Sequence, residues 1–138
     1  MSNSTTRAKP SAPPLLLRAY RLTRYRAAGH AIRIDRLVPD ALFDRLAVRA
    51  AVVLTAWNPR SRRIPEGWNR RMQQRLRQWL RRRVVAEAEG SLHRWHEAML
   101  LVGGDVRPAI RLAARFRQRG VVILRRGQKA RLRLLRAA

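Results

Sequence analysis

The longest apolar runs along the chain predict buried strands. Residues 50–57 (AAVVLTAW) form a continuous run rich in β-branched side chains, which is typical of a strand covered on both faces. Residues 97–102 (EAMLLV) and 121–124 (VVIL) have the same character. These three segments are therefore expected to form buried strands, and their order in the sheet stays open.

Alternating apolar and polar positions predict further strands nearer the two ends. Residues 15–27 (LLLRAYRLTRYRA) alternate in part, and residues 31–34 (AIRI) follow a turn at Gly29. Residues 130–135 (ARLRLL) alternate more clearly, and the turn RRGQK would join them to the preceding strand. We expect this hairpin to place the last strand at an edge of the sheet.

Apolar positions with helical spacing predict three helices between these strands. Residues 39–48 open with Pro and Asp and gather their apolar side chains on one side. Residues 66–83 form the longest predicted helix, and residues 105–119 follow Asp105 as N-cap, with Gly120 as the stop. The apolar stripe expected to pack the longest helix on the sheet consists of Trp68, Met72, Leu76, Trp79 and Leu80.

These elements predict an α+β (mixed α/β) fold. We expect a central sheet of about five to six strands, two to three helices packed on it and a C-terminal β-hairpin. A length of 138 residues suits one domain, taken as residues 15–138 after a Ser-, Thr- and Pro-rich tail at residues 1–14 that we expect to be disordered. With no membrane-spanning run and no leader with a cleavage site, a cytoplasmic location is the expectation.

The charge of the chain indicates the class of partner. There are 32 basic and 8 acidic residues, for a net charge of +24, and 32 − 2 lysines leaves 30 arginines. Such a field attracts polyanions, so an RNA or DNA backbone, bound without sequence specificity, or a small anionic ligand is the expected partner. A GC-rich genome would also raise the arginine content. The absence of cysteine excludes disulfides, thiolate metal sites and a cysteine nucleophile.

The segment TAWNPRSRRIPEGWN runs from the end of a predicted strand through a polar loop to the start of a helix. Backbone N–H groups and the positive end of the helix would favour an anion at such a corner. The alternative is that the polar side chains only satisfy the amides of the turn. The glycine pattern of a nucleotide phosphate loop is missing. The side chains that could contribute to a site are Asn58, Arg60, Ser61, Arg62, Arg63 and Asn69.

A second group of chemical interest lies in the segment HRWHEAM. In an extended chain His93 and Glu97 would point one way and His96 the other, whereas on a helix the three would share a face and could serve a metal. The candidates for a further zinc ligand are His30 and Asp35. Nothing in the sequence specifies their approach, so we predict no metal site and no cofactor. Glu97, in a chain with so many arginines, is expected to pair with one of them or to bond loop amides rather than to act in acid–base catalysis. Gln118 could line the same site or cap the end of its own helix.

The order of these motifs resembles an uncharacterised bacterial family, domain of unknown function 3293, over roughly residues 20–135. Members similar to this chain carry Thr-Ala-x-Asn-Pro-x-Ser at a strand end, an Asn in the next helix, Trp-x-Glu before a strand and Phe-x-Gln before the next. The matching residues are Thr55, Asn58, Pro59, Ser61, Asn69, Trp95, Glu97, Phe116 and Gln118. The resemblance implies candidate positions but no reaction, and the arginine excess departs from the family pattern.

Two classes of function therefore follow from the sequence. The first is a small basic protein that binds an anionic partner. The alternative is a small-molecule-binding or enzymatic domain, which predicts one concave pocket built from Asn58, Ser61, Asn69, Glu97 and Gln118. The patterns leave open the ligand, the oligomeric state and whether the protein is an enzyme.

Overall fold

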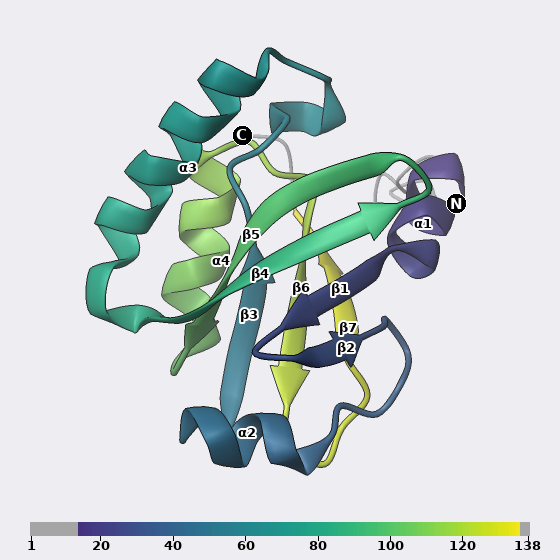
Figure 1. Cartoon of the computed structure of the whole chain (residues 1–138), viewed down its shortest axis with the longest axis vertical. Helices are drawn as coiled ribbons and strands as arrows, with labels where there is room; N and C mark the ends of the chain where they lie inside the picture. The colour runs from purple at the N-terminus through teal and green to yellow at the C-terminus, as the bar shows by residue number, and fades with distance from the viewer. Residues whose placement is uncertain (1–13, 136–138) are drawn as a thin grey trace, which may run out of the picture.

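Seven strands form one antiparallel, curled sheet in a computed structural model that describes residues 14–135 (Figure 1). The order across the sheet is β2-β1-β4-β5-β3-β6-β7. The strands are β1 (Arg24–Ala27), β2 (His30–Ile32), β3 (Ala50–Leu54), β4 (Val84–Leu92), β5 (Trp95–Gly103), β6 (Gly120–Arg125) and β7 (Arg131–Leu134). The helices are α1 (Pro14–Leu22), α2 (Asp40–Leu46), α3 (Glu66–Leu80) and α4 (Val106–Arg115), with short 3-10 turns at Pro59–Ser61 and Arg81–Arg83.

The predicted α+β class is confirmed, with seven strands and four helices in the described range rather than the smaller numbers expected. The C-terminal hairpin is also confirmed, because β6 pairs antiparallel with β7 and β7 lies at an edge. The predicted tail at residues 1–14 lies outside the described residues except for Pro14, the first residue of α1. No helix between residues 14 and 135 combines the length and apolar character needed to cross a membrane.

Two elements differ from the sequence predictions. The first half of residues 15–27, predicted as a strand, is the helix α1. Its partly buried side chains are Leu16, Leu17, Ala19 and Tyr20, and buried Thr23 lies just beyond its end. The Thr23 hydroxyl donates to the Ala19 carbonyl at 2.6 Å and closes the helix before β1 begins. Strand β4 was missed, because its small and acidic side chains have low strand propensity; its pairing with both β1 and β5 sustains it.

Two apolar layers lie on the two faces of the sheet. The inner layer fills the concave side, where Tyr25, Met99 and Leu101 meet Phe43 of α2. The outer layer lies under α3 and α4 and includes Leu100 on the opposite face of β5. Because side chains alternate along a strand, the odd-numbered residues of β5 from Trp95 onward face the concave side.

Helix α3 presents a different face to the sheet from the one predicted. Its buried or half-buried side chains are Asn69, Met72, Gln73, Leu76 and Leu80. At about 100° per residue they span an arc of about 100°, and both tryptophans lie outside it. Trp68 is 57% exposed and Trp79 is 66% exposed, so the expectation that these rings pack on the sheet is wrong. The segment that follows β3, residues 55–64, is called the corner. The polar Asn69 and Gln73 take the inward positions because their side chains hydrogen-bond to the backbone of the corner.

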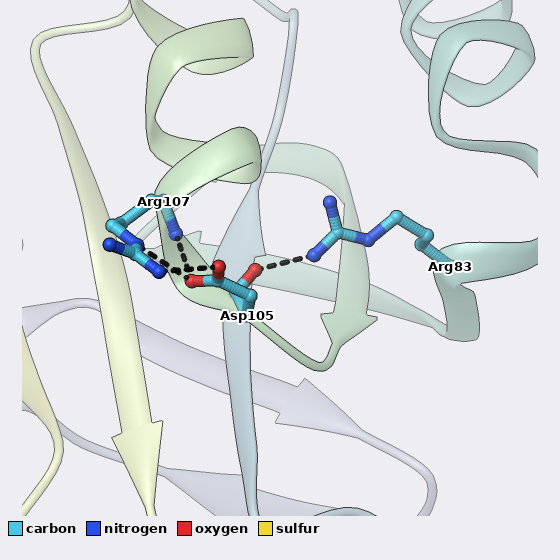
Figure 2. Close-up of polar contacts among 3 residues, drawn as sticks. All are labelled: Arg83, Asp105 and Arg107. Atoms are coloured by element: carbon cyan, nitrogen blue, oxygen red, sulfur yellow. Dashed lines mark hydrogen bonds and ion pairs between the residues drawn. The ribbon is translucent and has the colours of Figure 1, made fainter.

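The start of α4 matches the sequence prediction. The Asp105 carboxylate accepts a hydrogen bond from the Arg107 N–H at 3.1 Å and two from the Arg107 guanidinium, as Figure 2 shows. Arg83 donates to the Asp105 carbonyl and ties this cap to the end of the 3-10 turn before β4. The helix ends at Arg115 rather than at residue 119, because Arg117 turns into a left-handed conformation at φ 60°.

The two edges of the sheet approach one another. The Asp35 N–H donates to the Ala130 carbonyl at 2.8 Å, and the Ala130 N–H donates to the Arg36 carbonyl at 2.9 Å. A further bridge joins Leu37 to Lys129. The segment after β2 is therefore bonded to the residues that precede β7, and the curled sheet is close to a barrel at this end.

Candidate functional site

The corner after β3 is built from unusual backbone conformations. Asn58, Arg60 and Ser61 all have positive φ, at 46°, 58° and 60°. Asn tolerates this region, but Arg and Ser adopt it at a cost of about 1–3 kcal/mol each. The Arg60 N–H donates to the Arg117 carbonyl at 2.8 Å, and the Ser61 N–H donates to the Asn58 carbonyl at 2.9 Å. Contacts with the end of α4 therefore hold the corner in its strained form.

A buried hydrogen-bond network organises the corner around Asn58. Asn69 of α3 accepts from the Asn58 N–H at 2.8 Å and donates to the Asn58 side-chain oxygen at 3.0 Å. The same oxygen accepts from the Ile64 N–H at 3.1 Å, and the Asn58 side-chain NH2 donates to Glu97 Oε2 at 3.0 Å. These contacts fix both the position and the amide orientation of Asn58. Asn69 therefore holds Asn58 in place through two hydrogen bonds, and the Asn58 side-chain NH2 group points at Glu97.

Gln118, just after α4, is hydrogen-bonded to the same corner. Its side-chain NH2 donates to the Trp57 carbonyl at 3.1 Å and, more weakly, to the Phe116 carbonyl at 3.4 Å. The second bond is the local helix-end contact that the sequence suggested, and the first ties α4 to the end of the segment that follows β3. Both Asn58 and Gln118 are buried, with 9% exposure each. Gln118 thus acts on the corner as well as on its own helix end.

Glu97 is a buried acid without a basic partner. It is 7% exposed and, in the described part of the chain, its carboxyl group is hydrogen-bonded by Asn58 and pairs with no arginine. The expected Glu97–Arg pair is therefore wrong, because the strand register turns Glu97 toward the concave side while the loop arginines are exposed. Burial raises the pKa of Glu97 to about 7, and the hydrogen bond from Asn58 opposes that rise in part.

A cavity of about 330 Å³ is lined by Glu97 together with residues of α1 and of the corner. Its walls are mainly apolar. They come from α1, from the strands β1, β3, β4, β5 and β6, and from the corner. Burial, together with the charge of Glu97, raises the pKa of the Tyr20 hydroxyl to about 12, and burial also raises the pKa of Tyr25. The polar side chains on the wall are Tyr20, Thr23, Tyr25, Thr55, Asn58, Ser61, Arg63, Glu97 and Gln118.

Two glycines keep this cavity open. A Cβ on Gly90, which lies opposite Glu97 in the β4–β5 ladder, would approach the Met99 methyl group to 2.7 Å. A Cβ on Gly120 would lie 3.2 Å from the Tyr20 ring. A larger side chain at either position would therefore displace Met99 or Tyr20, both of which line the cavity.

The residues singled out from the sequence divide into three sets. Asn58, Ser61, Glu97, Gln118 and Arg63 line the cavity, and Asn69 holds Asn58 from beneath. Arg60 and Arg62 are exposed and do not line it. The sequence analysis did not predict Tyr20, Tyr25 and Trp57 as part of the site. The alternation of residues 23–27 does indicate that Tyr25 faces inward.

Most backbone amides of the corner are already hydrogen-bonded within the chain. The N–H groups of Asn58, Arg60, Ser61, Arg62 and Ile64 all donate within the chain. In the described part of the chain no hydrogen bond engages the N–H groups of Arg63, Glu66 and Gly67 at the start of α3, so an anion held there stays a prediction.

The histidines do not join Glu97. His93 occupies the exposed turn between β4 and β5, with φ 54°, and His96 lies exposed on β5 on the opposite face from Glu97. Within residues 14–135 no group of three or more His, Cys, Asp or Glu side chains could hold a metal ion. The carboxyl group itself, with a pKa near neutrality, is suited to accept and release a proton at neutral pH.

A family model described as "Protein of unknown function (DUF3293)" matches residues 54–121. Residues 54–121 resemble the DUF3293 family. The match is narrower than the expected 20–135, but it contains the corner, Asn69, Glu97 and Gln118. The α1 wall of the cavity lies outside it. No curated protein and no solved structure matches the chain.

Proposed function

We propose that the cavity beside Glu97 binds a small, mainly apolar molecule that carries one hydrogen-bonding group, such as a hydroxyl or an amine. The observation that carries the proposal is a buried carboxyl group in a mainly apolar wall, bonded by Asn58 and without an ion-pair partner among residues 14–135. Ligand sites are typically concave and apolar with a few convergent polar groups. The cavity combines both features.

The protonation of Glu97 defines the ligand group that it would receive. With a pKa of about 7, the carboxyl group is divided between its acid and carboxylate forms at neutral pH. The carboxylate accepts from an O–H or N–H donor, whereas a second anion beside it would be repelled. The tyrosines and Met99 provide apolar surface around that point. A neutral or cationic polar group on an apolar body therefore fits better than a phosphate.

A thermal-shift screen of small aromatic and aliphatic alcohols and amines tests the proposal. A ligand that binds the folded state raises the unfolding temperature by mass action. We expect compounds that stabilise the natural protein to lose this effect in Glu97→Gln, which keeps the shape but not the charge, and in Ala19→Phe, which fills the cavity from α1. Glu89→Gln is the matched control, because Glu89 is exposed on the adjacent strand and faces away from the cavity.

Two outcomes would refute the pocket function. One is that no compound of this class stabilises the natural protein. The other is that the stabilising compounds act equally on Glu97→Gln and Ala19→Phe, which would locate their binding elsewhere on the surface.

A second candidate function, binding to a polyanion such as an RNA or DNA backbone, is supported by the charge. The net charge is +24, and the described residues contain five ion pairs, so most arginines carry no acidic partner. Binding of this kind weakens steeply with salt, by about 0.9 in log K per phosphate contact for a tenfold rise in salt on duplex DNA. Fluorescence anisotropy with labelled duplex and single-stranded DNA at low salt tests it, and lack of binding there would refute it.

A further inference from the structure

We propose that the exposed flank of α3 binds single-stranded nucleic acid, with bases stacked on two tryptophans and phosphates bound by the arginines between them. This inference rests on the second candidate function and is independent of the cavity. We call the flank the tryptophan stripe and define it as Trp68, Arg71, Arg75 and Trp79. These four residues follow one another at spacings of three or four along the helix and therefore share one side of it.

The tryptophans of the stripe have no role in the core. Both rings are more than half exposed, although Leu76 and Leu80 on the adjacent face of α3 are buried against the sheet. A large ring left in solvent next to an available core is unusual, since burial of such a ring is strongly favourable. The Arg71 guanidinium lies over the Trp68 ring at 5.5 Å from its centroid, which orders both side chains at the surface.

The spacing and charge of the stripe fit a single strand. Trp68 and Trp79 are eleven residues apart, which is about 16 Å along a helix at 1.5 Å per residue. At a rise of about 3.4 Å per nucleotide, this distance covers about five stacked nucleotides. Base stacking on exposed aromatic side chains, with arginines along the backbone, is how proteins bind single strands without sequence preference. In a duplex the base faces are already stacked and unavailable to the rings.

The same features disfavour a membrane surface as the partner. A helix that lies in a membrane interface needs a continuous apolar face. The apolar face of α3 is already used against the sheet, where Leu76 and Leu80 are buried. The exposed flank offers two separate rings with Arg71 and Arg75 between them. This alternation matches a chain of bases and phosphates better than a lipid surface.

Fluorescence anisotropy with a fluorescein-labelled oligothymidylate of about 10 nucleotides tests the stripe. We expect Trp68→Ala and Trp79→Ala each to raise Kd by about 5-fold or more, with the salt slope unchanged, because stacking is lost and charge is not. Leu37→Ala, another exposed apolar residue but far from α3 in sequence, is the control and should bind like the natural protein. Thermal unfolding of each variant confirms that the exposed changes leave the fold intact.

Two arginine variants distinguish binding at the tryptophan stripe from general electrostatic attraction to the whole protein. We expect Arg71→Ala to weaken binding more than Arg111→Ala, which removes the same charge from the exposed side of α4. The Arg71 change should also reduce the salt slope by about 0.7, the contribution of one phosphate contact on a single strand. A uniform electrostatic attraction would instead make the two arginine variants equal and both tryptophan variants neutral.

The outcomes distinguish the stripe from the function on which it rests. If the natural protein binds but the tryptophan variants bind equally well, the stripe is refuted and the polyanion function stands. If the natural protein binds duplex DNA but not the oligothymidylate at low salt, the stripe alone is refuted. If it binds neither, both are refuted. Vesicles of phosphatidylcholine and phosphatidylserine form a third arm: tryptophan-dependent binding to these vesicles, without binding to the oligonucleotide, would overturn the inference in favour of a membrane surface.

Discussion

Replacing Glu97 by glutamine should change how the free energy of unfolding depends on pH. Below about pH 4.5 the carboxyl group is protonated in the folded and the unfolded chain, so its burial carries no charge penalty. As the pH rises from 4.5 to about 7, the unfolded chain releases its proton while the folded protein retains it. The free energy of unfolding of the natural protein therefore falls between pH 4.5 and about pH 7. Above about pH 7 the folded protein holds a buried carboxylate.

The size of the effect follows from the two pKa values. A difference between about 7 and 4.5, at about 1.4 kcal/mol per pKa unit, corresponds to about 3 kcal/mol. Glutamine has the same shape and no charge, so the stability of Glu97→Gln relative to the natural protein should rise by about that amount between pH 4 and pH 8. The ionisable groups that share the cavity with Glu97 do not change their protonation over this range, because the pKa of Tyr20 is about 12 and Arg63 stays protonated.

Urea unfolding at a series of pH values measures this difference directly. Glu89→Gln, exposed on the adjacent strand, serves as the matched control and should differ from the natural protein by a constant, small amount. An NMR titration of the Glu97 carboxyl carbon should show a midpoint near 7. A midpoint near 4.5, or a stability difference that does not change with pH, would refute the burial argument for Glu97.

Three further changes test the supporting structure by chemical denaturation. Asn69→Ala should cost about 3 kcal/mol, because it leaves buried polar groups of the corner without partners, whereas Gln74→Ala on the exposed side of α3 should cost little. Asp105→Ala should cost about 1 kcal/mol through loss of the α4 cap, and Asp105→Asn, which can cap equally well, should restore most of it. Leu76→Ala should cost about 2–5 kcal/mol and Trp79→Ala much less; the reverse order would contradict the orientation of α3.

The sequence predicted those elements whose local pattern agrees with their final environment. The continuous apolar runs became β3, β5 and β6, and the N-cap signal at Asp105 began a helix at the next residue. Strand β4 could not be recognised, because Ala86, Glu87 and Ala88 favour a strand only when neighbouring strands pair with them. The helix α1 was hidden by a partial alternation that also fits a helical period.

The candidate site was predictable in its residues but not in its chemistry. Asn58, Glu97 and Gln118 stood out as polar groups at the ends of predicted elements, and hydrogen bonds bring all three to one corner. Whether Glu97 would meet an arginine depended on which face of β5 it occupies, and register is a property of the assembled sheet. The inward positions of Asn69 and Gln73 on α3 were likewise set by the bonds that they make to the corner.

The bonds between the segment after β2 and Ala130 have a consequence for behaviour at high concentration. Unpaired strand edges are templates on which a second molecule can add its own strand. Here the chain links the two ends of its sheet to one another, and the outermost strand β7 is short and carries Arg131 and Arg133 with exposed side chains. Two copies that meet through the β7 edge would bring these like charges together, which should disfavour self-association of the folded protein through that edge.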